Sequence, residues 1–101
     1  MRYDALVQRV KTAVFESRAT TSPEMRRAAA EQRLGELPVS LRDYVAKVAK
    51  HAYRVTDEDV EALKHAGYSE DQIYELTAAA AVGAALKRLD RGMQALKESR
   101  S

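Results

Sequence analysis

Residues 55–73 read VTDEDVEALKHAGYSEDQI and contain two helix starts on either side of one helix stop. Thr56, with Asp59 three residues later, has the form of a capping box, although an aspartate reaches back less well than a glutamate. Ser69, with a glutamine three residues later, begins a second capping box. Gly67 stands where a left-handed residue ends the first helix. Only a tight hairpin of two helices fits this arrangement.

Apolar residues at helical spacing continue on both sides of the hairpin and predict five helices. The helix that begins at Pro23 has a thin apolar face made mostly of alanine, so we expect it on the surface or against a partner. The helix after it carries a broad apolar stripe that faces the core. The expected ranges are 2–19, 23–34, 40–54, 57–66 and from 70 to beyond 96.

The last predicted helix contains a stretch, Ala78–Ala85, that is apolar on every side and is therefore expected to be buried by several neighbours. Gly83 inside it costs about 1 kcal/mol relative to alanine, which indicates either close packing against a neighbour or a tolerated defect. The chain is thus predicted to be an all-α single domain, a bundle of about five helices. Residues 1–36 would form the N-terminal helices, 37–96 the core around the hairpin, and 97–101 a frayed tail.

The composition excludes several classes of function. The 101 residues carry a formal net charge of +2 and include no cysteine. The lack of cysteine excludes disulfides, thiolate metal sites and thiol catalysis, and the small positive charge does not indicate nucleic acid. The first residues lack the apolar core of a signal peptide, and the longest apolar run is too short to span a bilayer. We expect a cytoplasmic soluble protein with no nucleic-acid partner, no membrane partner and no cofactor.

Three segments follow one another in a recognisable order: Tyr44–Ala49, then Ala62–Ile73, then the alanine-rich helix Leu76–Leu89. In this order they resemble the core of the alkylhydroperoxidase AhpD-like and carboxymuconolactone decarboxylase-like proteins. The resemblance covers residues 37–96. It implies an AhpD-like helical fold with the hairpin at its centre.

The thiol peroxidases of that family carry Cys-x-x-Cys, a His four residues after the second Cys, and a helix-ending Gly eight residues after the His. Counting back from Gly67 places Asp59 at the His position and Ala52–Val55, AYRV, at the Cys-x-x-Cys position. The upstream Glu of the family falls near Ser40. A peroxidatic thiol must be deprotonated to attack a peroxide, so thiol peroxidase and disulfide reductase activities are excluded.

A decarboxylase-like activity needs acid and base groups but no thiol, and the candidates are His51, Tyr53, Arg54 and Asp59 near the helix junction. His51 borders the apolar stripe of its helix, and its ordinary pKa near 6.5 suits a general acid or base. A histidine in this place is more often a half-buried boundary residue. His65 points away from the core and fits a position at a helix end. Since neither histidine has a second His at i+4, we expect no helical metal site.

Two further clusters are expected to have structural roles. The carboxylates within residues 57–61 lie at a helix N-terminus, where acids are favoured. Tyr44, Tyr53, Tyr68 and Tyr74 either line an aromatic pocket or pack the ends of the hairpin, and we favour packing because tyrosine combines apolar area with a polar hydroxyl.

The arginines offer little basic surface in the sequence. Arg26, Arg27 and Arg33 form the nearest approach to a basic patch, and nucleic-acid binding would need more positive charge than this. Arg88 and Arg91 could make ion pairs between helices, with Asp90 between them and Glu75 more than three turns earlier as the acids.

Three functions remain open from the sequence. The leading hypothesis is a non-catalytic, self-associating AhpD-like protein, because the thiol positions are vacant and the alanine-rich helix needs partners. The alternatives are a thiol-independent decarboxylase-like enzyme that uses His51 on an unidentified small molecule, and a small adaptor that docks other proteins through its first two helices. The expected partner is a second copy of the chain.

Overall fold

The computed structural model describes residues 5, 7–8, 11–16 and 19–100. No strand occurs in this part of the chain, so the all-α prediction is confirmed. The predicted helix over 2–19 lies partly outside the described residues, and its described part is helical up to residue 16. The elements in chain order are the π-helix η1 (Thr12–Glu16), α2 (Pro23–Ala30), the short 3₁₀ helix η2 (Leu34–Glu36), α3 (Val39–His51), the 3₁₀ helix η3 (Ala52–Arg54), α4 (Asp57–His65) and α5 (Glu70–Arg100).

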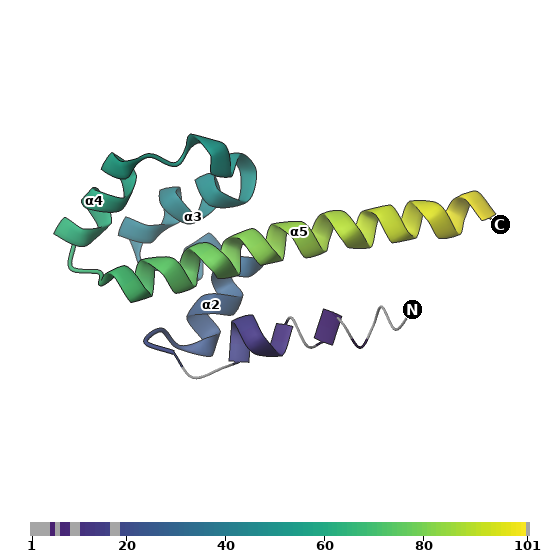
Figure 1. Ribbon diagram of the computed structural model, residues 1–101, viewed down its shortest axis with the longest axis horizontal. Coiled ribbons are helices and arrows are strands. Elements are labelled where there is room, and N and C mark those ends of the chain that lie inside the picture. The colour runs from purple at the N-terminus through teal and green to yellow at the C-terminus, as the bar shows by residue number, and fades with distance from the viewer. Residues whose placement is uncertain (1–4, 6, 9–10, 17–18, 101) are drawn as a thin grey trace.

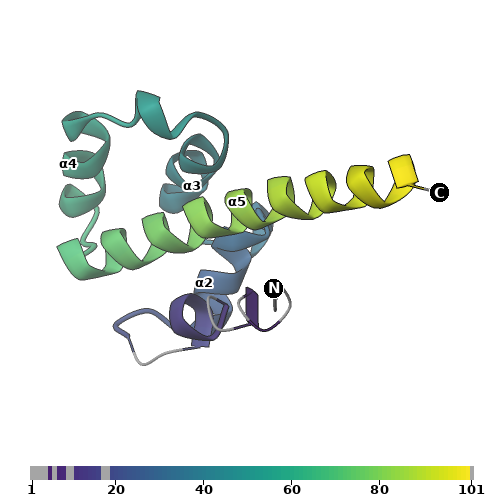
Figure 2. The same cartoon turned by 45° about the vertical axis from the view of Figure 1, so that its right-hand side comes forward.

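The long helix α5 is the axis of the molecule. Its 31 residues span about 46 Å, most of the longest dimension of 52 Å. Figure 1 shows α3 and α4 on one side of α5 and α2 on the other, with the C-terminal part of α5 projecting past all three. Figure 2 shows the same projection from a second angle. No helix in the described residues is both long enough and apolar enough to cross a membrane.

The core lies where α2 and α3 pack against the N-terminal half of α5. The predicted apolar stripe of α3 is part of this core, as are residues from α2, α4 and η1. The buried apolar residues are Phe15, Ala28, Ala29, Ala30, Leu37, Leu41, Tyr44, Val45, Val48, Leu63, Ile73, Leu76, Ala79 and Ala80.

The crossing of α2 over α5 is the closest helix contact described. A Cβ atom added at Gly83 would lie 2.3 Å from the carbonyl oxygen of Ala30, so only glycine fits there. Of the two alternatives for Gly83, close packing is therefore confirmed. The prediction that α2 is a surface helix is wrong, because Ala28, Ala29 and Ala30 are all buried. Their small side chains give α2 a thin apolar face and also let its backbone approach α5.

The helix α2 ends at Ala30, four residues before the predicted end. Gln32 adopts a left-handed conformation with φ of 58°, and its amide donates to the carbonyl of Ala29 while the amide of Arg33 donates to that of Ala28. This is a Schellman ending, in which glycine is usual. The Gln32 side-chain amide compensates by donating to the carbonyl of Val45 at 3.3 Å.

The hairpin of α4 and α5 forms as predicted. Thr56 and Asp59 exchange both hydrogen bonds of a capping box, and Ser69 and Gln72 do the same at 2.9 and 3.1 Å. Gly67 ends α4 with φ of 105°. Each of these features depends only on residues a few positions apart, which is why the sequence sufficed to predict them.

Two predictions about α5 differ from the structure. Burial of Ala78–Ala85 on several sides is only partial, since Ala81 and Ala85 are exposed because α2 and α3 leave part of the helix uncovered. The helix also continues to Arg100, through the residues for which fraying is predicted. Ser101 lies outside the described residues.

Candidate functional site

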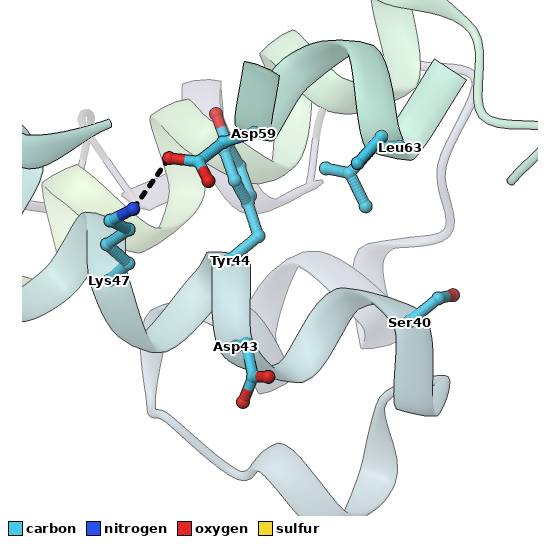
Figure 3. A pocket seen from close by; sticks show the side chains of 7 residues that line it. Ser40, Asp43, Tyr44, Lys47, Asp59 and Leu63 are labelled. Carbon is cyan, nitrogen blue, oxygen red and sulfur yellow. Dashed lines mark hydrogen bonds and ion pairs between the residues drawn. The ribbon is translucent and has the colours of Figure 1, made fainter. Parts of the chain in front are cut away.

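A cleft of about 210 Å³ opens between α3 and α4. Figure 3 shows Lys47 on α3 directed toward Asp59 in the first turn of α4, with the apolar Leu63 one turn further along α4. This cleft contains one of the predicted site residues, Asp59. The lining consists of Ser40, Asp43, Tyr44, Lys47, Asp59, Ala62 and Leu63.

The strongest polar contact of the cleft joins Lys47 to Asp59. The Nζ atom of Lys47 lies 2.7 Å from Oδ2 of Asp59, and both side chains are about one-third exposed. The same carboxylate oxygen accepts the Thr56 amide at 2.9 Å in the capping box. The hydrogen bonds from Lys47 and then from Thr56 lower the pKa of Asp59 below its ordinary value. Asp59 is therefore held as an anion that caps α4 and ties it to α3.

The hydroxyl groups of the cleft also have partners inside the protein. The Thr77 hydroxyl donates to the carbonyl of Ile73 at 2.6 Å, so its oxygen accepts the proton of the Tyr44 hydroxyl, also at 2.6 Å. Ser40 shares a hydrogen bond of 2.9 Å with the hydroxyl of Tyr68. These bonds fix α3 against the hairpin rather than presenting donors to a ligand.

The charges of the cleft suit structure better than proton transfer. Lys47 and Asp59 neutralise each other. Asp43 makes no hydrogen bond or ion pair among the described residues, so the cleft keeps one net negative charge. A general base that works near neutral pH needs a pKa close to 7, whereas the pKa of Asp59 is lowered. Within the described part of the chain, no group of three or more His, Asp or Glu side chains could hold a metal ion.

The other three predicted site residues meet on the surface where α3 ends. The predicted helix over 40–54 stops at His51, and η3 brings the His51 ring to within 5.9 Å of the Tyr53 ring in an edge-on arrangement. The guanidinium of Arg54 lies 5.7 Å from the centre of the Tyr53 ring. All three are exposed, Tyr53 by 79%. His51 is exposed rather than half-buried at the edge of the apolar stripe, and its backbone leaves the helical conformation, with φ of −145° and ψ of 58°.

The remaining candidates are dispersed over the structure. His65 is exposed at the end of α4, with Nδ1 2.8 Å from the carbonyl of Glu61, which agrees with a helix-end position. Tyr53 and Tyr74 are exposed while Tyr44 is buried, so the four tyrosines do not form one aromatic pocket. Packing is confirmed for Tyr44 and for Tyr68, which packs against the core.

The arginine predictions need correction. Arg26 is only 2% exposed, and its Nη1 atom donates to the carbonyl of Val14 at 2.9 Å, so it contributes nothing to a surface patch. Glu75 binds Thr20 and Thr21 rather than an arginine. Arg88 donates to the carbonyl of Ala49 at 3.3 Å.

The Glu75 carboxylate fastens the segment before α2 to α5. It accepts the backbone amides of Thr20 and Thr21 at 3.1 and 2.8 Å and their hydroxyls at 3.0 and 2.6 Å. Burial raises the pKa of Glu75, but these four hydrogen bonds outweigh burial and lower the pKa to about 2. No pattern in the sequence predicts this contact, because its partners lie more than fifty residues apart.

Comparison with known proteins found no matching protein-family model, curated protein or solved structure. The likeness to the AhpD-like family therefore rests on the residues of the hairpin and its flanking helices alone. In the structure, the segment at the family's Cys-x-x-Cys position, Ala52–Val55, forms η3 and the residue after it. Asp59, at the family's His position, is a capping residue.

Proposed function

We propose that this chain is a non-catalytic helical protein that self-associates through the projecting half of α5. The observation that carries the proposal is an apolar seam that begins at Leu86, which packs against the core, and continues along the projecting half through Leu89, Met93 and Leu96. Leu89 and Leu96 are 44% and 45% exposed, and Leu86 and Met93 are half-buried. A helix that exposes several large apolar residues on one face has a surface that a partner would cover.

The spacing of the seam supports a helix as the partner. Its residues are separated by three, four and three positions, which is close to the average of 3.5 found in paired helices. Ala79 and Val82 continue the same pattern toward the core. The seam is thus an extension of the face that already packs inside the protein.

The flanks of the seam support a second copy of this chain as that partner. On one side lie Asp90 and Lys97, whose charges cancel. On the other side lie Ala85, Gly92 and Ser99, which are small and uncharged. Two identical seams would therefore meet without net repulsion, and the small residues would let the two backbones approach.

The expected association is weak and reversible. Burying the exposed half of a leucine side chain contributes about 1 kcal/mol, so Leu89 and Leu96 in two copies contribute about 4 kcal/mol together. Association costs at least about 4 kcal/mol in lost translation and rotation. These two terms cancel, so the net affinity must come from the half-buried Leu86 and Met93 and from the rest of the contact. A Kd near 1 mM requires about 4 kcal/mol from them, so we expect a dimer only as the concentration approaches 1 mM.

The AhpD-like relationship is part of this proposal. Its support is the capped hairpin followed by an alanine-rich helix, in a chain whose thiol positions hold no cysteine. The decarboxylase-like enzyme is less well supported, because His51 lies exposed on the surface and lines none of the three described cavities.

Sedimentation equilibrium across about 10 µM to 1 mM tests the proposal. The wild type is expected to shift from monomer toward dimer, and the double variant Leu89→Glu, Leu96→Glu to stay monomeric. Ala95→Glu places one glutamate on the exposed back of the same helix and is expected to dimerise like the wild type. The single neutral variant Leu89→Gln is expected to weaken association less than the double glutamate variant does. A wild type that stays monomeric at every concentration would overturn the proposal, as would equal association of the wild type and all three variants.

A further inference from the structure

A second cavity, of about 290 Å³, lies where the end of α2, the last turns of α3 and the middle of α5 meet. Its lining holds four cationic side chains, Lys50 from α3 and Lys87, Arg88 and Arg91 from α5, and no acidic side chain. These residues are thirty-seven or more positions apart between the two helices. Only the tertiary structure brings them together.

The positive charge of this cavity is not neutralised within the described part of the protein. Arg88 donates to the carbonyl of Ala49 at 3.3 Å. Lys50, Lys87 and Arg91 make no hydrogen bond or ion pair with any described residue. Lys87 also borders the adjoining cavity, whose lining includes Glu31 and Asp90. Among the described cavities, Lys50, Arg88 and Arg91 line only the one without an acid.

Elsewhere in the described chain, several cations have carboxylate partners. Lys47 pairs with Asp59 at 2.7 Å and Lys64 with Glu70 at 2.6 Å. Arg33 pairs with Glu36 at 2.6 Å. The cavity between α2, α3 and α5 departs from this pattern by gathering four cations without one acid.

The helix ends nearby do not account for this charge. The C-termini of α2 and α3 each carry about −0.5 of an elementary charge, which sums to about −1 against the +4 of the four side chains. Lys87 and Arg91 are also four residues apart on α5, and like charges at this spacing repel one another and destabilise the helix. Asp90, three residues after Lys87, offsets part of this repulsion for Lys87 but does not line the cavity.

We infer that this cavity binds a small polyanion that carries phosphate groups. The planar guanidinium groups of Arg88 and Arg91 match the geometry of phosphate oxygens. The ammonium groups of Lys50 and Lys87 add positive charge and can donate hydrogen bonds in several directions. The volume is close to the lower limit of about 300 Å³ for small-molecule sites, which suits a diphosphate group with a small organic substituent. The side chain of Gln32 and the methyl groups of three alanines complete the wall.

Calorimetric titration of the full chain with inorganic pyrophosphate, at low salt and then at about 150 mM salt, tests this inference. Binding is expected at both salt levels, weaker at the higher one because salt screens the exposed charges. The double variant Lys87→Gln, Arg91→Gln is expected to bind at least tenfold more weakly, and equal affinity of this variant and the wild type would overturn the inference. Lys97→Gln removes one charge from α5 outside the cavity and is expected to bind within twofold of the wild type.

Two further ligands distinguish a phosphate site from general attraction between charges. Sulfate at matched ionic strength is expected to bind more weakly than pyrophosphate, and equal binding would show general charge attraction and overturn the inference. A single-stranded RNA whose affinity exceeds that of pyrophosphate and rises with length would overturn it in favour of nucleic acid.

One further variant separates this cavity from the apolar seam of α5. The neutral pair Leu89→Gln, Leu96→Gln is expected to lose self-association and to bind pyrophosphate with the affinity of the wild type, because neither leucine lines the cavity and no charge is added. Failure of self-association and failure of phosphate binding are therefore distinguishable.

Discussion

The two halves of α5 have the same kind of sequence and opposite surroundings. In the N-terminal half, Ile73, Leu76 and Ala80 are buried by α2 and α3. In the C-terminal half, Leu89 and Leu96 follow the same helical spacing and remain nearly half exposed. The spacing of apolar residues thus determines which face of a helix is apolar, but it does not determine whether anything covers that face.

The covered half is also the half with special backbone contacts. Gly83 admits the backbone of Ala30 at a distance no side chain would allow, and Glu75 holds the segment before α2 through four hydrogen bonds. The projecting half has a glycine too, at position 92, but a Cβ atom there would meet nothing within 4 Å. The same residue type therefore has a packing function in one half only.

The largest expected difference between the halves comes from truncating a leucine in each. Leu76 is 1% exposed, so Leu76→Ala should lower the free energy of unfolding by about 2–5 kcal/mol through lost burial and a new cavity. Leu96→Ala should cost about 1 kcal/mol or less, because less apolar surface is buried there. Urea unfolding followed by circular dichroism, at concentrations low enough for monomers, measures both. Equal losses would mean that the projecting half is covered within its own chain.

A methyl group added to each glycine of α5 should act with opposite sign. Gly83→Ala forces α2 away from α5 and should destabilise the protein by about 1–3 kcal/mol, the usual cost of overpacking. Gly92→Ala improves helix propensity in open space, and it should stabilise the protein by up to about 0.5 kcal/mol, because this end of α5 can open locally before the core unfolds. Thermal and urea unfolding of the wild type and of both variants measure these changes in stability. A stabilising Gly83→Ala would show that the helices do not cross as closely as described.

The Glu75 contact should make the covered half sensitive to acid. Its pKa is about 2 when folded against an ordinary 4.5, so its stabilisation is complete above about pH 5 and is lost as the pH falls toward 2. After allowance for partial exposure, we expect about 1–2 kcal/mol. Glu75→Gln should lower stability by this amount at pH 7 and by little at pH 2. The other acidic groups are present in both proteins, so they cancel when the unfolding free energies of the wild type and the variant are subtracted. If this difference in free energy were as large at pH 2 as at pH 7, the stabilising role of the Glu75 carboxylate would be contradicted.

The smallest expected effect is that of Ala95→Gly in the projecting half. This end of α5 can open locally without unfolding the core, so the global free energy of unfolding should change by less than about 0.5 kcal/mol. Ala80→Gly, in the covered half, should cost about 2 kcal/mol through lost helix propensity and a lost buried methyl group. Hydrogen exchange should show the same contrast, with faster exchange after residue 90 than between residues 73 and 86. Similar protection in both halves would rule out local opening.

In the candidate sites too, contacts between residues a few positions apart were predictable from the sequence, and contacts between separate helices were not. The capping function of Asp59 was predictable because Thr56 is three residues away. Its ion pair with Lys47 was not, because that contact depends on how α3 lies against α4. The exposure of His51 depends on where α3 ends, and a periodic apolar pattern does not predict that end. The cationic cavity could be anticipated only in part, from the run of Lys87, Arg88 and Arg91 without its α3 partner.

By itself, the sequence determined the all-helical class, the capped hairpin and the absence of thiol chemistry. These follow from residue type and from interactions within a few positions, where backbone geometry leaves few choices. Only the tertiary structure decided that α2 is a core helix, that Arg26 is buried, and that four cations share one cavity. Such outcomes depend on which helices cross and where, and contacts between distant segments are set by packing rather than by local preference.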